Sequence, residues 1–370
     1  MRRTVSIKLG PDAEQAGALS DLAVEFAAGC NLVAGIAAES RCLNRVRLHH
    51  MAYYQVRERT RLGSQMACNT MRAVAGAYRT LKTNKRLPEE GSFPRIVFGD
   101  RGSVHFDQRT YRIDFDTVSL YTLDGRIRVP MRLGDFQRRY LERGAPREAK
   151  LVRKKKGWFF HLVLEVPAAE PREGGVLGVD LGENNIAATS TGQVFGGGGL
   201  RDERDRFLAL RGRLQRNGSQ SARQRLAKVS GRERRHVTHV NHEVSKAIVA
   251  QALASGAGVI ALERLTHIRK RIRAGKRVRS RLHRWAWAQL QDMIAYKAEA
   301  AGIEIRYVNP AYSSQTCHAC GQLASRKRHT LSCTCGNRAH ADVNAALNLA
   351  WLAETAVSAR GVVSRPDVAA

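Results

Sequence analysis

The stretch from Val176 to Ser190 constrains the fold of this chain more than any other. An apolar run carries Asp180 toward its end, Gly182 follows two residues later, and a second apolar run resumes at Ile186 after a polar turn. The stretch therefore predicts a β-hairpin with a carboxylate inside it. Such a carboxylate needs a cation, a hydrogen-bond network or a raised pKa. We favour a divalent metal ion; the alternative is an aspartate that caps a turn.

The net charge of the chain indicates a polyanionic partner. In 370 residues, 62 lysines and arginines stand against 33 aspartates and glutamates, which gives a formal net charge of +29. Such an excess repels itself unless phosphates or counterions lie nearby, so we expect nucleic acid as the partner. The sequence shows neither an unbroken apolar run of membrane length nor a cleavable signal. We therefore expect a cytoplasmic protein that does not bind a membrane.

The N-terminal half changes its pattern twice. Residues Thr4 to Leu9 alternate as a half-buried strand does, a helical spacing follows, and short runs with β character begin at about Phe93. These runs cover residues 95–98, 112–115, 119–122, 126–129, 151–153 and 158–166. We expect a small β-barrel or a curled sheet, with the helices inserted into it. In that insert, Tyr53 and Tyr54 lie among basic residues; they could stack on nucleic acid, or simply pack on a solvated helix.

A second acid ends another apolar run, where Glu263 follows Val259 to Leu262. From Arg264 through Gln291 there is no acidic residue, whereas arginines and lysines crowd together between Arg269 and Arg284. A charged run is usually just solvated. The length of this one, without any compensating acid, favours contact with a polyanion.

Four of the seven cysteines cluster late in the chain. The cluster consists of Cys317, Cys320, Cys333 and Cys335. Clustered thiols in a chain without a secretory signal indicate metal rather than disulfides, and four thiolates complete a closed, structural zinc site. Only one residue separates the second pair. If that geometry cannot close, His318, His329 or His340 could replace a cysteine.

A third acid, Asp342, stands at the start of a run of helix formers from Ala341 to Ala350. An aspartate at such a position commonly caps the helix. Because capping and metal binding use the same oxygens, the two roles compete.

In chain order, these three acids and the cysteine cluster resemble the RuvC-type nuclease core of TnpB proteins, the insertion-element relatives of type V CRISPR effectors. The matching segments are Gly178 to Gly182, Leu262-Glu263, Tyr312 to Gly321 with the first cysteine pair, and Ala341 to Ala346. The resemblance covers about Gly175 to Ala353, and the first half matches only in layout. The chain departs at its second cysteine pair and at His340-Ala341, where many relatives carry Asp-Arg.

The resemblance implies a multi-domain α/β fold, with an RNase H-like (RuvC) core, a zinc-ribbon insertion, and an N-terminal wedge-like β-barrel domain with a helical recognition insert. The wedge is expected over residues 1–11 and 93–170, with the insert over 12–92. The nuclease domain is expected over 176–309 and 339–355, the ribbon over 310–338, and a disordered tail over 356–370.

The resemblance also implies an RNA-guided DNA endonuclease of a prokaryote, nucleoid-associated and monomeric with its RNA. A guide RNA from the end of the element would pair with target double-stranded DNA, and the N-terminal domains would read a short motif beside the target. We expect Asp180, Glu263 and Asp342 to converge on two catalytic Mg²⁺ ions, with Asp180 bridging both. One Zn²⁺ would be structural. The alternatives are a guided DNA-binding repressor without cleavage and a transposase that performs strand transfer.

Overall fold

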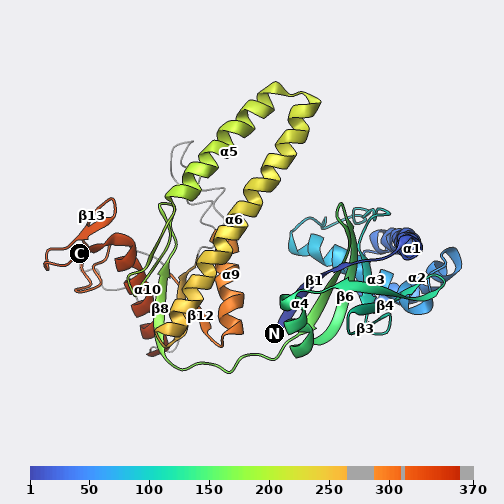
Figure 1. Cartoon of the computed structure of the whole chain (residues 1–370), viewed down its shortest axis with the longest axis horizontal. Helices are drawn as coiled ribbons and strands as arrows, with labels where there is room; N and C mark the ends of the chain where they lie inside the picture. The colour runs from blue at the N-terminus through green and yellow to red at the C-terminus, as the bar shows by residue number, and fades with distance from the viewer. Residues whose placement is uncertain (265–286, 310–312, 359–370) are drawn as a thin grey trace. The chain divides into compact units, whose positions relative to one another are not determined.

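The computed structural model of this protein describes residues 1–264, 287–309 and 313–358. The chain forms two compact units, Met1–Pro167 and Ala168–Ala370, which are described separately (Figure 1). Most of the basic run that follows Glu263, and the end of the tail from residue 359, lie outside the described residues.

The first unit is built on a seven-stranded antiparallel sheet that almost closes into a barrel. Its strands are β1 (Arg2–Leu9), β2 (Val104–Asp107), β3 (Tyr111–Asp114), β4 (Thr117–Thr122), β5 (Gly125–Arg132), β6 (Ala145–Lys154) and β7 (Gly157–Glu165). Their order is β2-β6-β7-β1-β5-β4-β3. The two edge strands, β2 and β3, follow one another in the chain and are joined by residues 108–110. The short connection keeps the two edges of the sheet near each other.

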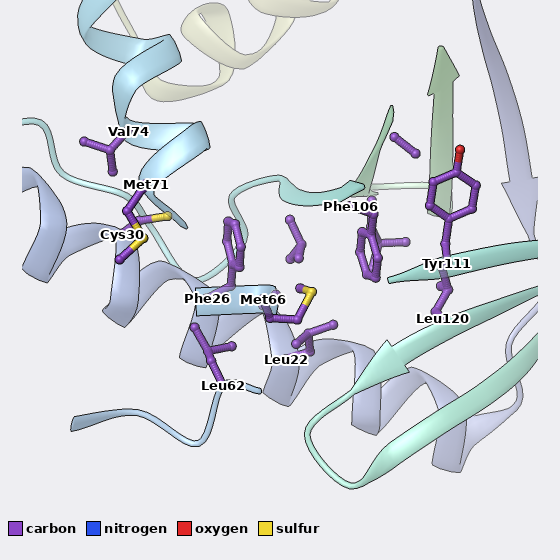
Figure 2. Packing of buried hydrophobic residues seen from close by; sticks show 14 of the residues in the cluster. Leu22, Phe26, Cys30, Leu62, Met66, Met71, Val74, Phe106, Tyr111 and Leu120 are labelled. Carbon is purple, nitrogen blue, oxygen red and sulfur yellow. The ribbon is translucent and has the colours of Figure 1, made fainter. Parts of the chain in front are cut away.

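Four helices complete this unit: α1 (Ala13–Glu39), α2 (Arg45–Arg59), α3 (Ser64–Thr83) and α4 (Asp135–Arg143). Figure 2 shows Leu22 and Phe26 of α1 packed with Met66 of α3 and with Phe106 of the sheet. By length and composition α1 could cross a membrane. In this structure it is a core helix of the first unit, because Leu19, Leu22 and Phe26 are buried in this cluster.

The expected strand at residues 95–98 does not form. The Asn31 side chain hydrogen-bonds the backbone of Phe98 where a neighbouring strand would have done so. It accepts from the Phe98 amide at 2.8 Å and donates to the Phe98 carbonyl at 2.9 Å. The backbone at this point is therefore satisfied by a helix side chain and not by a neighbouring strand.

The second unit is built on a mixed five-stranded sheet. Its strands are β8 (Gly175–Asp180), β9 (Asn185–Thr189), β10 (Val194–Gly196), β11 (Ala257–Glu263) and β12 (Glu304–Val308), in the order β10-β9-β8-β11-β12. The pairs β10–β9 and β9–β8 are antiparallel, and the pairs β8–β11 and β11–β12 are parallel. The hairpin predicted around Asp180 is the β8–β9 pair.

Helices cover both faces of this sheet. On one face, Leu177, Val179 and Leu262 pack with α6 (Gln220–Ala254) and α9 (Trp287–Ala300). On the other face, Ala261 packs with Leu349 of α10 (Ala341–Ser358). The two sets of contacts follow the alternation of side chains along a strand.

Two further parts extend from this sheet. Helix α5 (Gly198–Asn217) runs antiparallel to the first half of α6, and together they form a long hairpin that projects beyond the sheet (Figure 1). We call residues 198–236 the arm. The ribbon is a small antiparallel sheet of β13 (Ser325–Lys327), β14 (Thr330–Ser332) and β15 (Arg338–His340). Its last strand leads directly into α10.

Candidate functional site

Asp180 and Glu263 lie side by side at the carboxyl ends of two neighbouring parallel strands, β8 and β11. Leu262 pairs with Val179 in the register of these strands, which brings the next residue of each strand together. Asp180 comes two residues after Gly178, and Glu263 comes two residues after Ala261; both of these small residues contact α10. Residues two apart in a strand point to the same face of the sheet. Both carboxyl groups therefore lie on the side of the sheet that α10 covers.

These two carboxyl groups are hydrogen-bonded to each other, and both have raised pKa values. Burial raises the pKa of Asp180 to about 6, and the nearby carboxylate of Asp342 also raises it. Burial and the charge of Asp180 together raise the pKa of Glu263 to about 9. Without a cation, Glu263 therefore keeps its proton at neutral pH and donates a hydrogen bond to the carboxylate of Asp180. A divalent cation can take the place of that proton, because it compensates the charge of both groups.

Asp342 is the second residue of α10, and it is only 7% exposed. Its Oδ1 accepts a hydrogen bond from Nη2 of Arg326 at 2.7 Å, and its Oδ2 accepts one from Nδ2 of Asn185, also at 2.7 Å. Both partners lie outside the helix, so the carboxylate is engaged by tertiary contacts, whereas its position in the sequence suggested a cap.

The three acids share one neighbourhood, since the charge of Asp342 acts on the pKa of Asp180. They do not form one tight cluster. Within the described ranges, two groups of three or more His, Cys, Asp or Glu side chains have ligand atoms that all lie within 4.8 Å of one another. One group is the four cysteines, and the other joins Asp342 to His329 and His340. Arg326 and Asn185 occupy the carboxylate oxygens that an ion shared with Asp180 would use.

Arg326 and Asn185 were not singled out from the sequence. Asn185 opens β9 directly after the turn that follows Asp180, so its place at the same edge of the sheet could have been inferred from the hairpin. Arg326 is the middle residue of β13, sixteen positions before Asp342. No local pattern marks it, because only the path of the ribbon brings it to α10.

The four cysteines come together as the sequence predicts. The sulfur atoms of Cys317 and Cys335 are 3.8 Å apart, and those of Cys320 and Cys333 are 3.5 Å apart. Zinc–sulfur bonds of about 2.3 Å in a tetrahedron place the sulfurs about 3.8 Å from one another. The cluster therefore has the dimensions of a closed zinc site, and the single-residue spacing of the second pair does not prevent it from closing.

No histidine takes the place of a cysteine in the described cluster. The ring of His318 is 2.9 Å from Oδ1 of Asn344, and the rings of His329 and His340 stack on each other. Burial raises the pKa of Cys317, but hydrogen bonds from the Asn337 side chain and from backbone amides outweigh it and lower that pKa to about 6. This thiol is therefore prepared for the thiolate form that zinc requires.

The ribbon is also attached to α10 by side-chain hydrogen bonds. Asn344 and Asn348 of α10 donate to the carbonyl oxygen of Thr316, just before the first cysteine, at 2.7 and 2.8 Å. Asn348 also donates to the carbonyl oxygen of Ser313 at 2.8 Å. The cysteine cluster and the helix that carries Asp342 are thus held together.

Two protein-family models match this chain. Residues 160–269 match the model described as a probable transposase, OrfB_IS605, and residues 287–349 match the Cas12f1-like TNB domain. The first match includes Asp180 and Glu263; the second includes the four cysteines and Asp342.

Sequence relatives agree with these matches. The CRISPR-associated endodeoxyribonuclease Cas12f1 of Sulfoacidibacillus thermotolerans is 42% identical over 114 residues, which are 30% of this chain and 26% of that protein. A TnpB-like protein of Methanocaldococcus jannaschii is 37% identical over 127 residues, which are 34% of this chain and 45% of that protein. The matched stretches thus span less than half of either relative.

The fold agrees with a solved relative as well. A structure of a Cas12f1–sgRNA–target DNA complex superposes with a TM-score of 0.64 at 16% identity, covering 92% of this chain and 83% of that one. Together these findings confirm the resemblance to TnpB proteins. They also confirm the fold class: an N-terminal near-barrel sheet, a mixed RuvC-like sheet and a ribbon-like cluster of four cysteines.

Proposed function

We propose that this relative of TnpB and Cas12f proteins is an RNA-guided DNA endonuclease that hydrolyses the target phosphodiester at Asp180, Glu263 and Asp342. The observation that supports it most is the half-buried, hydrogen-bonded pair of Asp180 and Glu263, which ends two parallel strands on the face where α10 carries Asp342. Relatives named as endodeoxyribonucleases support the reaction class.

The residues of this site suit Mg²⁺. All three acids offer the hard carboxylate oxygens that Mg²⁺ prefers, and the shared proton of Asp180 and Glu263 marks a place where positive charge is favoured. Two bound Mg²⁺ ions would supply an activated water and stabilisation of the departing 3′ oxygen. Asp180, Glu263 and Asp342 would hold these ions.

The chain's own residues prepare this site. Glu263 must release its proton, because a protonated carboxyl group is a poor ligand. Asn185 fixes Oδ2 of Asp342, which orients that carboxylate at the edge of the sheet. The closed cysteine cluster is assigned to one structural Zn²⁺, which would hold the two cysteine pairs of the ribbon together and leave no open position for chemistry.

Two basic surfaces support guide RNA and target DNA as partners. The arm buries only Leu200 and Ala222 along residues 198–236, so many of its side chains face solvent. Its exposed cations are Arg206, Arg213, Arg216, Arg223, Arg225, Lys228, Arg232, Arg234 and Arg235. In the first unit, a pocket of about 830 Å³ is lined by Arg45, Arg72, Arg79 and Lys150. Such surfaces neutralise phosphates irrespective of base sequence.

The products of a plasmid reaction test this proposal. The protein is purified with the RNA that is transcribed from its own element, and is incubated with a plasmid that carries the matching target and with Mg²⁺. Linear plasmid ending in newly hydrolysed strands supports the endonuclease. Plasmid that is bound but intact indicates a guided repressor, and joined strands indicate a transferase; either result overturns the proposal.

A further inference from the structure

The ribbon brings two histidines together next to Asp342. Lys327 of β13 pairs with Thr330 of β14, so the turn between these strands is tight, with Arg328 at a positive φ of 54° and His329 after it. Thr330 also pairs with His340 of β15. The backbone of this small sheet therefore places the two histidines side by side.

Their side chains converge as well. The imidazole rings of His329 and His340 stack with their centroids 5.7 Å apart and their planes 22° from parallel. One nitrogen of each ring and one oxygen of Asp342 lie within 4.8 Å of one another. His329 is exposed and His340 is half-buried, so an ion can reach them from solvent, whereas the carboxylate of Asp342 is buried.

Two imidazoles and one carboxylate form a donor set different from the three acids proposed for Mg²⁺. Mg²⁺ prefers oxygen ligands, whereas imidazole nitrogen suits Zn²⁺ and its transition-metal neighbours. Three protein ligands also leave a coordination position for water. We propose that His329, His340 and Asp342 form a second transition-metal site, separate from the cysteine cluster, which binds Zn²⁺ and withdraws Asp342 from the Mg²⁺ site.

Arg326 competes with such an ion. Its guanidinium group already donates to Oδ1 of Asp342 at 2.7 Å and places a positive charge beside the carboxylate. Removing that charge should tighten binding of the ion if Asp342 is a ligand, and should have little effect if the two histidines act alone. The substitution Arg326→Gln therefore separates a three-ligand site from a histidine pair.

Direct binding tests the site without any reference to cleavage. Protein that already holds one equivalent of Zn²⁺ is titrated with more Zn²⁺ by calorimetry, and total zinc is counted by metal analysis. We expect a second equivalent in the wild type, binding weaker by about tenfold or more in both His329→Ala and His340→Ala, and tighter binding in Arg326→Gln. His50→Ala, which changes an exposed histidine of the first unit, is the matched control and should bind as the wild type does.

Three binding results overturn the site: only one equivalent in the wild type, a second equivalent unaffected in both histidine variants, or binding that does not respond to Arg326→Gln.

Inhibition of cleavage by the second Zn²⁺ rests on the proposed function and is tested in a separate experiment. Mg²⁺-dependent cleavage is measured with and without added Zn²⁺, and the two rates are compared. We expect Zn²⁺ to inhibit the wild type and to inhibit His329→Ala at least about tenfold less potently. If the second Zn²⁺ binds but does not inhibit cleavage, Zn²⁺ does not withdraw Asp342 from the Mg²⁺ site, and that part of the proposal is wrong. Absence of cleavage at every Zn²⁺ concentration counts against the proposed nuclease and leaves the binding result standing.

Discussion

Asp180 and Glu263 occupy positions where ionising both of them costs free energy. They are neighbours in the register of β8 and β11, and burial disfavours charge on each. A pair of acids in this setting is a stability cost unless positive charge compensates it. Two acids at these positions are therefore better explained as ligands of a cation than as side chains that stabilise the fold.

The pH dependence of stability follows from this pair. The folded state holds the Glu263 proton up to a pKa of about 9, whereas the unfolded chain releases it near the ordinary value for glutamate. Stability without Mg²⁺ should therefore fall as the pH rises through the interval between these values. Glu263→Gln keeps a hydrogen-bond donor toward Asp180 and removes the titrating proton. We expect it to stabilise the Mg²⁺-free protein at pH 8 by on the order of 2 kcal/mol.

Thermal unfolding at a series of pH values measures this effect. The difference between variant and wild type should shrink as the pH falls toward about 4, where the unfolded wild type also begins to keep its proton. Added Mg²⁺ should raise the melting temperature of the wild type at pH 8 more than that of the variant. Equal pH dependence in the two proteins would contradict the raised pKa of Glu263.

For single residues, the sequence identified the candidate metal ligands more readily than the side chains that contact them. Asp180 and Glu263 could be recognised because each is a lone acid at the end of an apolar strand. Asp342 gained its role only from the family resemblance, since an aspartate at a helix start has a simpler explanation. Arg326 could not be found, because its contact with Asp342 depends on how the ribbon folds back onto α10.

Among the elements, the packing of α10 on β8 decides where Asp342 lies. Gly178 makes this packing possible, because a Cβ at that position would overlap the carbonyl oxygen of Ala346 and lie 2.8 Å from the amide nitrogen of Ala350. The helix therefore rests on the backbone of the strand. In the sequence Gly178 was only one residue of a matching motif. The structure shows that a glycine is needed there because α10 packs directly on the strand.

The substitution Gly178→Ala should push α10 away from β8. Both obstructing atoms belong to the backbone, so they cannot move aside as a flexible side chain would. We expect a loss of stability on the order of 2 kcal/mol and a loss of cleavage larger than the loss of RNA binding. Gly175→Ala is the matched control in the same strand, since nothing lies within 4 Å of its added Cβ. Equal melting temperatures and cleavage rates in the two variants would show that α10 does not depend on this contact.

For the whole molecule, hydrophobic periodicity predicted the near-barrel and its helical insert because most of those elements bury one face. Periodicity failed where the burial of side chains does not determine the secondary structure. Helix α4 has only nine residues and none of them is fully buried, and residues 95–98 look like a strand although the Asn31 side chain hydrogen-bonds Phe98. The helices of the arm are basic, and few of their side chains are fully buried. The projection of the arm beyond the sheet follows from the pairing of α5 with α6, which composition does not encode.

The central claim is that Asp180, Glu263 and Asp342 form one cation site that cuts guided DNA. It is tested most directly by comparing the wild type and Asp180→Ala, each with the same RNA, for both target binding and Mg²⁺-dependent plasmid cleavage. We expect the two proteins to bind the target with similar affinity, and the variant to cut at least about a thousandfold more slowly. A variant that binds and cuts as the wild type does would contradict the claim.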